Sequence, residues 1–250
     1  MESTSKDVLF TIAMKSELPD LLRWCESSKK IYRDVCNNDD VWRAKLLKEY
    51  PDYNNSDIYP FLSSLSPRET YVFMYQLSYI KKLSNWSVTL KDIYLKKELF
   101  LDMKKLKKIP SFNLPNLRRL YLNYNHLTKV PSFELPNLQE LYLSGNQLTE
   151  VPNFALPNLK ILALSHNQLT EVPNFMFPNL QFLYITGNQL TQVPNFNLPK
   201  LQILSLENNQ LKEIPNFVFP KLATLYLKVN NLTEASKEEI KERYGNKVSL

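Results

Sequence analysis

The chain repeats itself every 21 residues from Leu114 onward. The copies follow the pattern L-x-x-L-x-L-x-x-N-x-L-[TK]-x-[VI]-P. A proline marks the same point in each copy: Pro115, Pro136, Pro157, Pro178, Pro199 and Pro220. A unit of this length is too short to bury its own apolar residues, so it must stack against the units on either side. The period therefore predicts a solenoid for this part of the chain rather than a single closed core.

The pattern resembles the leucine-rich repeat. In the first full copy Leu120 and Leu122 flank one residue, and both point inward because side chains alternate along a strand. The resemblance implies an α/β solenoid whose stacked strands form a parallel sheet on the concave face. We assign residues 95–235 to seven coils, the first of which is degenerate and carries Lys104 in place of the asparagine. Residues 236–250 are expected to form a capping helix, with a Ser236–Glu239 capping box and Gly245 at its end.

Two columns of the repeat have structural explanations. The asparagine amides can pair with backbone groups that would otherwise be buried without a partner. The phenylalanines are expected to pack in the core. The asparagines are Asn125, Asn146, Asn167, Asn188, Asn209 and Asn230, and the phenylalanines are Phe112, Phe133, Phe154, Phe175, Phe196 and Phe217.

A function for the repeats must use the outward positions of the strands. Five of the seven residues between the strand leucines are aromatic, and Arg and Glu residues flank them. Exposed aromatic residues beside charged ones are typical of protein-binding surfaces. The alternative is that aromatic residues occur here only because they favour strands. The candidate target-binding residues are Phe100, Arg119, Tyr121, Glu140, Tyr142, Phe182, Tyr184 and Tyr226.

The N-terminal part of the chain has helical periodicity. Residues 7–47 resemble an F-box in the aliphatic first helix, the L-P-D-L-L step, the S-K-K-I-Y-R-D-V-C stretch and a tryptophan after an Asn/Asp-rich turn. The resemblance implies a small all-helical domain over residues 1–50 that docks on the adaptor of a cullin-RING (SCF-type) ubiquitin ligase. The residues that would carry this contact are Val8, Leu9, Ile12, Leu18, Pro19, Leu21, Leu22 and Trp42.

An F-box followed by leucine-rich repeats is similar to proteins that large DNA viruses of eukaryotes encode. That resemblance implies a substrate receptor, a monomer within its complex, in the cytoplasm of the host cell. The alternative is that the helices only cap the solenoid, which would leave a protein-binding scaffold with no ligase connection. Residues 51–94 are interpreted as a linker, over 52–65, and a connecting helix that begins with a Ser66–Glu69 capping box.

Composition excludes several other classes of protein. With three glycines in the whole chain, neither a P-loop nor a dinucleotide-binding fingerprint can be formed. No catalytic motif, metal-ligand cluster or cofactor site is evident, so we expect a non-enzymatic protein. The net charge of +6 arises from one lysine cluster between Lys96 and Lys108, which is too short to follow a nucleic acid backbone.

The N-terminus and the cysteines indicate an intracellular protein. The first residues lack the features of a signal peptide, and no apolar run is long enough to span a membrane. Cys25 and Cys36 lie eleven residues apart in a helical stretch. We expect them to be free thiols in a reducing compartment, because this spacing fits neither a zinc site nor a secreted disulfide framework.

Overall fold

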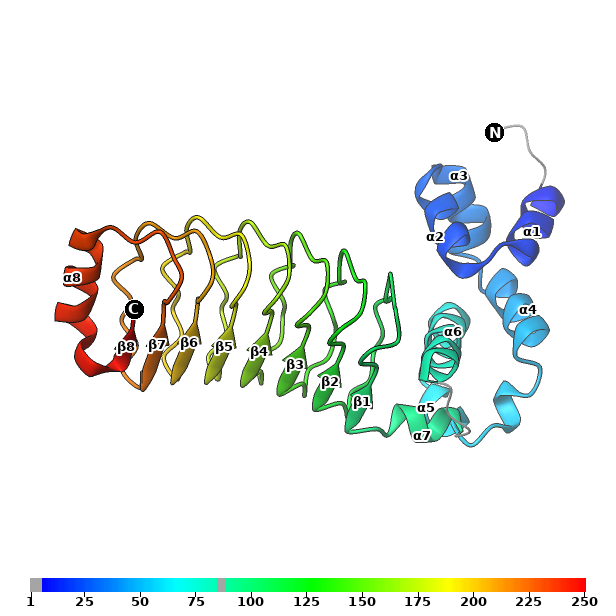
Figure 1. Cartoon of the computed structure of the whole chain (residues 1–250). Helices are drawn as coiled ribbons and strands as arrows, with labels where there is room; N and C mark the ends of the chain where they lie inside the picture. Colours follow the sequence, from blue (N-terminus) through cyan, green and yellow to red (C-terminus); the bar gives the residue numbers. More distant parts are fainter. Residues whose placement is uncertain (1–5, 85–88) are drawn as a thin grey trace. The chain divides into compact units, whose positions relative to one another are not determined.

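The computed structural model describes residues 6–84 and 89–250 (Figure 1). The chain divides into two compact units between Ile93 and Tyr94. The first unit is helical and the second is a solenoid of parallel strands.

The helical unit consists of short helices joined by tight turns. Its elements are α1 (Lys6–Lys15), α2 (Leu18–Glu26), α3 (Lys29–Ile31), the π-helix η1 (Tyr32–Cys36), α4 (Asp39–Glu49), the 3-10 helix η2 (Tyr53–Asn55), α5 (Tyr59–Leu62), α6 (Pro67–Ser84) and α7 (Leu90–Tyr94). The Ser66–Glu69 capping box is confirmed, since the Ser66 backbone N–H donates to Glu69 Oε2 at 2.9 Å and the Glu69 N–H donates to Ser66 Oγ at 3.3 Å.

One apolar core runs through this unit. Leu21, Trp42 and Tyr71 are fully buried, and the Trp42 and Tyr71 rings lie 5.6 Å apart. Because α6 carries Tyr71, it belongs to the same compact unit as α4, and the predicted domain boundary at residue 50 falls inside this unit. The segment 52–65 also differs from a simple linker, because Ile58 and Leu62 in it are buried.

The two cysteines form a disulfide, so the expectation of free thiols is wrong for this structure. The reason is local geometry. After α3 the chain widens into the π-helical turn η1, and Cys36 at the end of this turn lies 5.9 Å (Cα–Cα) from Cys25 on α2. That separation lies in the usual range for a disulfide.

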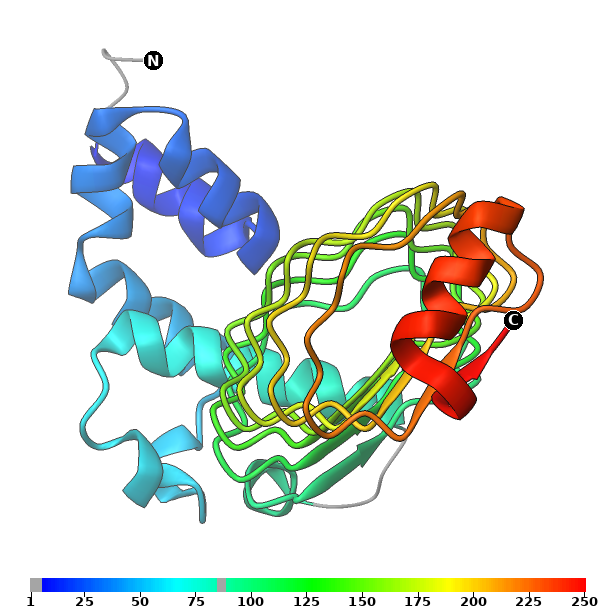
Figure 2. The same ribbon diagram turned by 90° about the vertical axis from the view of Figure 1, so that its left-hand side faces the viewer.

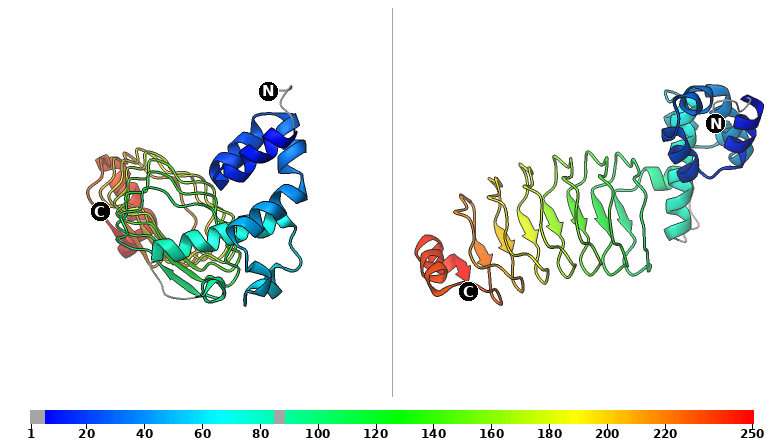
Figure 3. Two further views of the ribbon diagram at one scale, coloured as in Figure 1. Left: turned by 90° about the vertical axis from the view of Figure 1, so that its right-hand side faces the viewer. Right: turned by 90° about the horizontal axis from the view of Figure 1, so that it is seen from above.

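The solenoid places one short strand in each coil. The strands are β1 (Glu98–Phe100), β2 (Arg119–Tyr121), β3 (Glu140–Tyr142), β4 (Ile161–Ala163), β5 (Phe182–Tyr184), β6 (Ile203–Ser205) and β7 (Thr224–Tyr226). They pair in parallel, each with the next and in the register of the repeat, and stand side by side in one row in Figure 3. The predicted parallel-sheet solenoid is therefore confirmed.

The C-terminal end is closed by a helix and one further strand. The helix α8 (Glu234–Tyr244) lies across the last coil when the solenoid is viewed nearly along its axis (Figure 2). Its N-cap is Thr233, whose hydroxyl accepts from the Ser236 N–H at 3.1 Å, and not the predicted Ser236. Beyond α8, β8 (Val248–Ser249) pairs with β7 as an eighth strand that the sequence analysis did not anticipate.

The core of the solenoid follows the repeat. The inward leucines and the phenylalanine column are buried, as predicted. The asparagines form a ladder of hydrogen bonds: Asn167, for example, donates to the carbonyls of Leu143 and Leu164 and accepts from the Leu148 N–H, at 3.0–3.1 Å. The ladder pairs backbone groups of adjacent coils, which is a structural role.

The residue before each ladder asparagine has a left-handed backbone, as does Met103 before Lys104 in the degenerate first coil. This column comprises Met103, Tyr124, Gly145, His166, Gly187, Asn208 and Val229, with φ between 53° and 68°. Two of the chain's three glycines therefore stand where this conformation is required.

Candidate protein-binding site

The predicted target-binding residues lie together on the strands of one sheet. Strand pairing places Phe100, Tyr121, Tyr142, Ala163, Tyr184, Ser205 and Tyr226 in one column. A second column, two residues earlier on the same face, comprises Glu98, Arg119, Glu140, Ile161, Phe182, Ile203 and Thr224. The leucine between the two columns is fully buried in every strand. The two columns therefore form the outward surface of β1–β7.

Three aromatic rings at the start of this surface are stacked. The Phe100 and Tyr121 rings lie 4.6 Å apart with an angle of 11° between their planes, and the Tyr121 and Tyr142 rings lie 4.8 Å apart at 4°. These separations match the spacing of neighbouring strands, about 4.8 Å, so the rings stand upright on the sheet. Phe100 is 50% exposed at one end of the stack. The stack offers a partner a preformed, rigid aromatic surface.

A charged row runs beside the stacked rings. The Arg119 guanidinium pairs with the carboxylate of Glu98 on one side and that of Glu140 on the other, at 3.2 Å for Glu140. Both carboxylates raise the pKa of Arg119, the larger effect coming from Glu140. With two carboxylates around one cation, this row carries a net negative charge.

Tyr142 connects the two columns. Its hydroxyl donates to Glu140 Oε2 at 2.9 Å. Burial raises the pKa of Tyr142, and the hydrogen bond to Glu140 raises it further, because ionisation would place two negative charges side by side. Glu140 therefore uses one oxygen for Arg119 and the other for Tyr142, and all three side chains are fixed relative to one another.

The second half of the surface is more apolar and alternates between large and small residues. In the tyrosine column, Ala163 and Ser205 occupy positions where the neighbouring strands carry tyrosines. Both small residues are buried. The Phe182 and Tyr184 rings of β5 are parallel, 6.5 Å apart at 3°. The sequence shows which residues interrupt the column, but only the strand register shows that each gap is flanked by rings.

The residues expected to dock an adaptor divide into two groups. Leu9, Leu18, Leu21 and Trp42 are buried within the helical unit and hold its helices together, so they are core residues and not surface contacts. On the surface Ile12 is 42% exposed, Pro19 is exposed and Leu22 is half-buried. The side chain of Val8 lies outside the described residues. Of the predicted docking residues that the structure describes, Ile12, Pro19 and Leu22 are therefore accessible at the surface.

A polar cluster around Glu49 links helices of the same unit. The Lys45 ammonium is buried, donates to the Ser16 carbonyl at 2.6 Å and pairs with Glu49 at 2.6 Å. The Tyr71 hydroxyl donates to the other Glu49 oxygen at 2.7 Å, and burial raises the pKa of Tyr71. This cluster joins the residue that follows α1 to α4 and α6, and no sequence pattern marked it.

Within residues 6–84 and 89–250, no group of three or more His, Cys, Asp and Glu residues is arranged to hold a metal ion. In the same residues, no helix is both long and apolar enough to cross a membrane.

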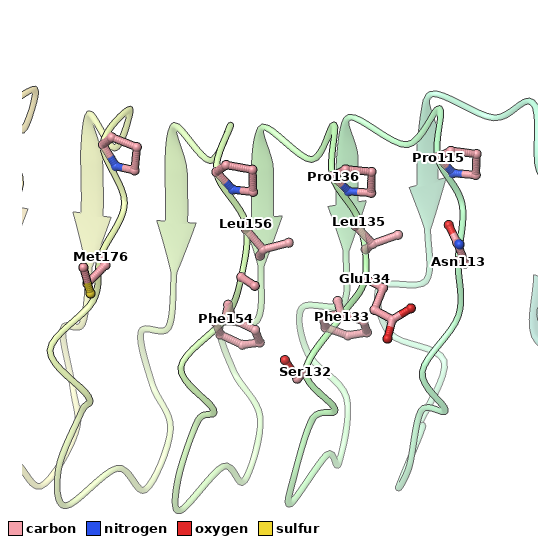
Figure 4. A pocket seen from close by; sticks show the side chains of 13 residues that line it. Asn113, Pro115, Ser132, Phe133, Glu134, Leu135, Pro136, Phe154, Leu156 and Met176 are labelled. Carbon is pink, nitrogen blue, oxygen red and sulfur yellow. The ribbon is translucent and has the colours of Figure 1, made fainter.

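A shallow groove lies on the opposite side of the solenoid from the strands. It has a volume of about 950 Å³ and is lined by the return segments of consecutive coils (Figure 4). Its floor includes the edges of Phe133 and Phe154, and Met176 stands at one side. Glu134 is the single charged residue that lines it. The groove presents mainly apolar surface.

Comparison with known proteins agrees with this architecture. A family model described as leucine-rich repeats (2 copies) matches four overlapping segments, residues 115–156, 136–175, 157–198 and 178–219. Residues 115–219 are leucine-rich repeats. No curated protein sequence matches the chain.

Solved leucine-rich-repeat structures resemble the solenoid. YopM from Yersinia enterocolitica is 26% identical, with a TM-score of 0.52 over 65% of this chain and 33% of its own length. A leucine-rich-repeat protein of Leptospira interrogans is 27% identical (TM-score 0.45, 64% of this chain, 38% of its own). InlP of Listeria monocytogenes is 23% identical (TM-score 0.46, 69% of this chain, 67% of its own). The chain spans about a third of the length of the first two.

Proposed function

We propose that this chain is a non-catalytic binding protein whose strand surface, over β1–β7, binds a target protein. The observation that carries the proposal is the ordered stack of Phe100, Tyr121 and Tyr142 beside the Glu98–Arg119–Glu140 row. Rigid aromatic rings supply contact area at low entropic cost, and a fixed row of charges supplies specificity. The shared strand register makes these groups one continuous surface.

The finer proposal is that the helical unit links the bound target to a ubiquitin ligase. It is supported by the resemblance of residues 7–47 to an F-box. The helical unit also has a core of its own and leaves Ile12, Pro19 and Leu22 at its surface. In that role the chain would raise the effective concentration of its target near the ubiquitin carrier. A scaffold without a ligase connection is the competing proposal, and it requires only the strand surface.

The disulfide places a requirement on one of these two proposals and not on the other. A ligase receptor works in the cytoplasm, where cysteines are kept reduced, whereas the structure pairs Cys25 with Cys36. The ligase proposal therefore requires the helical unit to remain folded with both thiols reduced. The scaffold proposal has no such requirement.

Adaptor docking is tested by co-purification of the full chain, expressed in a eukaryotic cell, with the F-box-binding adaptor and its cullin. The matched variants are Ile12→Asp, at an exposed residue of the helical unit, and Lys129→Asp, at an exposed residue of the solenoid. The ligase proposal predicts that adaptor and cullin are recovered with the unaltered chain and with Lys129→Asp, and are lost with Ile12→Asp. Absence of both proteins from the unaltered chain would contradict the ligase proposal and leave the scaffold.

Target binding is tested by selecting peptides from a random displayed library on the full chain. The proposal predicts peptides that bind the unaltered chain and lose at least about tenfold in affinity on the Tyr121→Ala, Tyr142→Ala double variant, because central aromatic residues dominate such interfaces. The variant should retain its melting temperature to within a few degrees. Peptides that bind both proteins equally would assign the tyrosines to strand propensity alone.

A further inference from the structure

We propose that a small polar pocket in the helical unit binds a phosphoryl group. The pocket has a volume of about 180 Å³ and lies between α4, η2, α5 and the start of α6. The residues that line it belong to the helical unit, so the proposal is independent of the strand surface. The segment 52–65, predicted to be a linker, forms one side of the pocket.

The size of the pocket restricts the ligand to one chemical group. Pockets that take whole small molecules have volumes of about 300–1,000 Å³. At about 180 Å³, this pocket is smaller than the lower end of that range. It therefore fits a compact ion or the end of one side chain of a partner, and not a nucleotide cofactor.

The lining of the pocket is cationic. Among the described residues, Arg43 is the only charged one that lines the pocket, and no ion pair joins its guanidinium to another of these residues. The Glu69 carboxylate, in the first turn of α6, accepts from the backbone N–H and the hydroxyl of Ser66 and does not line the pocket. Because a guanidinium binds oxyanions through charge-assisted hydrogen bonds, this lining selects an anion.

A buried hydroxyl without a partner marks the inner end of the pocket. Thr70 on α6 lines the pocket and is only 4% exposed. Its hydroxyl makes no hydrogen bond to any residue in the described part of the chain. It is also not enclosed by protein atoms, so its accessible side is the pocket. A buried hydroxyl normally has a partner, and one that lacks it in the protein indicates a ligand or a water molecule at that place.

The number of donors favours a phosphoryl group over a carboxylate. The hydroxyls that line the pocket belong to Tyr53, Tyr59, Ser63 and Thr70. The Ser63 hydroxyl already donates to a backbone carbonyl at 3.2 Å. The other three have no partner within residues 6–84 and 89–250, so with the guanidinium the pocket offers four free donor groups. A phosphoryl group has three strong acceptor oxygens and a carboxylate has two, so a phosphoryl group engages more of the lining.

The walls of the pocket are held in place before a ligand binds. The Tyr53 and Tyr59 rings meet edge to face, with their centres 6.2 Å apart and an angle of 61° between their planes. Ile58 and Leu62, which precede and follow Tyr59 in the chain, are buried and anchor this segment. A site whose donors are already positioned loses little entropy on binding.

The test uses the full chain with inorganic phosphate as the probe, at constant ionic strength. Phosphate that binds the folded helical unit raises its melting temperature, and the dependence on concentration gives the dissociation constant. Tryptophan fluorescence in a Trp86→Phe background reports this unit. Arg43→Gln removes the cation of the pocket, and Arg118→Gln makes the same change at an exposed arginine of the solenoid. We expect the dissociation constant to rise at least about tenfold in Arg43→Gln and to stay unchanged in Arg118→Gln. Equal stabilisation of all three proteins would be a general salt effect and would overturn the site.

A second variant separates binding from folding. Thr70→Val removes the unpaired hydroxyl and keeps a β-branched side chain of nearly the same shape. Because the hydroxyl has no protein partner, its loss should not lower the melting temperature in the absence of phosphate. The dissociation constant for phosphate should nevertheless rise about tenfold. A lower melting temperature without phosphate, together with unchanged phosphate binding, would assign Thr70 to packing alone and contradict the proposal.

Further probes identify the source of the phosphoryl group. The same measurement is made with acetate and with a peptide that carries one phosphoserine, alongside its unphosphorylated form. A phosphopeptide that binds through Arg43 more tightly than phosphate does would support the site and show that the group arrives on a partner. Phosphate binding with exclusion of the phosphopeptide would support a site for the free ion. Acetate that binds as tightly as phosphate would contradict the assignment of a phosphoryl group, and absence of binding by all of these probes would overturn the site.

Discussion

The ring of Tyr124 lies against Gly145, the equivalent residue of the next coil. A Cβ atom on Gly145 would come within 2.6 Å of Tyr124 Cδ1. The same relationship recurs two coils later, where a Cβ on Gly187 would come within 2.6 Å of His166 Nδ1. Both glycines also have positive φ. At Tyr124 and at His166 the ring is therefore followed in the next coil by a residue with no side chain, which leaves room for it.

Replacing Gly145 with alanine should destabilise the solenoid for two separable reasons. The left-handed backbone costs about 1–2 kcal/mol for a residue with a Cβ, and the contact with Tyr124 adds to it. Chemical denaturation should show a smaller loss for Gly145→Ala in a Tyr124→Ala background than in the unaltered chain, because removing the ring removes the contact and leaves only the backbone cost. Equal losses in the two backgrounds would contradict the packing account.

Loss of one ladder asparagine should cost more than loss of an exposed one. Asn167→Ala leaves the buried Leu148 N–H and two carbonyls without their partner, at a cost of about 1–3 kcal/mol for the unpaired groups. Asn158 also bonds a neighbouring coil, to the Pro136 carbonyl at 2.8 Å, but is exposed to water. Asn158→Ala should therefore change the free energy of unfolding by about 0.5 kcal/mol or less. Similar values for both variants in urea denaturation would argue against the ladder as a main source of stability.

Reduction of the disulfide should destabilise the helical unit and leave the solenoid unaffected. Closing a short loop between Cys25 and Cys36 is worth about 2–3 kcal/mol. Trp24 and Trp42 lie on α2 and α4, so in a Trp86→Phe background tryptophan fluorescence reports the helical unit. Its melting temperature should fall on adding reductant, and should not respond to reductant in the Cys25→Ser, Cys36→Ser variant. A thiol assay that finds both cysteines free in the purified protein would contradict the disulfide.

Tyr142 should ionise later than an unperturbed tyrosine. Its pKa is raised in the folded chain, chiefly by burial and then by Glu140, so folding favours the protonated form. The corresponding stability is complete below the ordinary tyrosine pKa of about 10 and is lost as pH rises through the higher folded value. An alkaline titration followed by ultraviolet absorbance should count one fewer late-ionising tyrosine in the Tyr142→Phe variant than in the unaltered chain. An unchanged number would contradict the Tyr142–Glu140 contact.

The repeat period was sufficient to predict the strands, their register and the buried columns, because every coil must satisfy the same packing. It could not reveal β8, since Val248 and Ser249 lie outside the period and pair only after α8 has turned the chain back. The disulfide was missed because it depends on the π-helical turn at Tyr32–Cys36, which eleven residues of sequence spacing do not specify.

The sequence was enough to predict which residues form the candidate site, but not the contacts that these residues make with one another. Alternation along a strand was enough to place Tyr121 and Tyr142 on the outward surface. The stacking of their rings and the pairing of Arg119 with two carboxylates depend on rotamers and register together. In the helical unit an apolar pattern marks core and docking residues alike, so Leu21 and Trp42 were assigned to a contact surface although both are fully buried.

The most direct test of the account is to locate the bound ligand. Hydrogen–deuterium exchange of the full chain should be measured with and without the tightest peptide from the library. Because the ligand would cover the outward face of the strands, we predict slower exchange in the segments that contain β2–β5, and no change in α1–α6 or in the return segment around Met176. Protection confined to the helical unit or to the groove side would contradict the claim that the strand surface is the binding site.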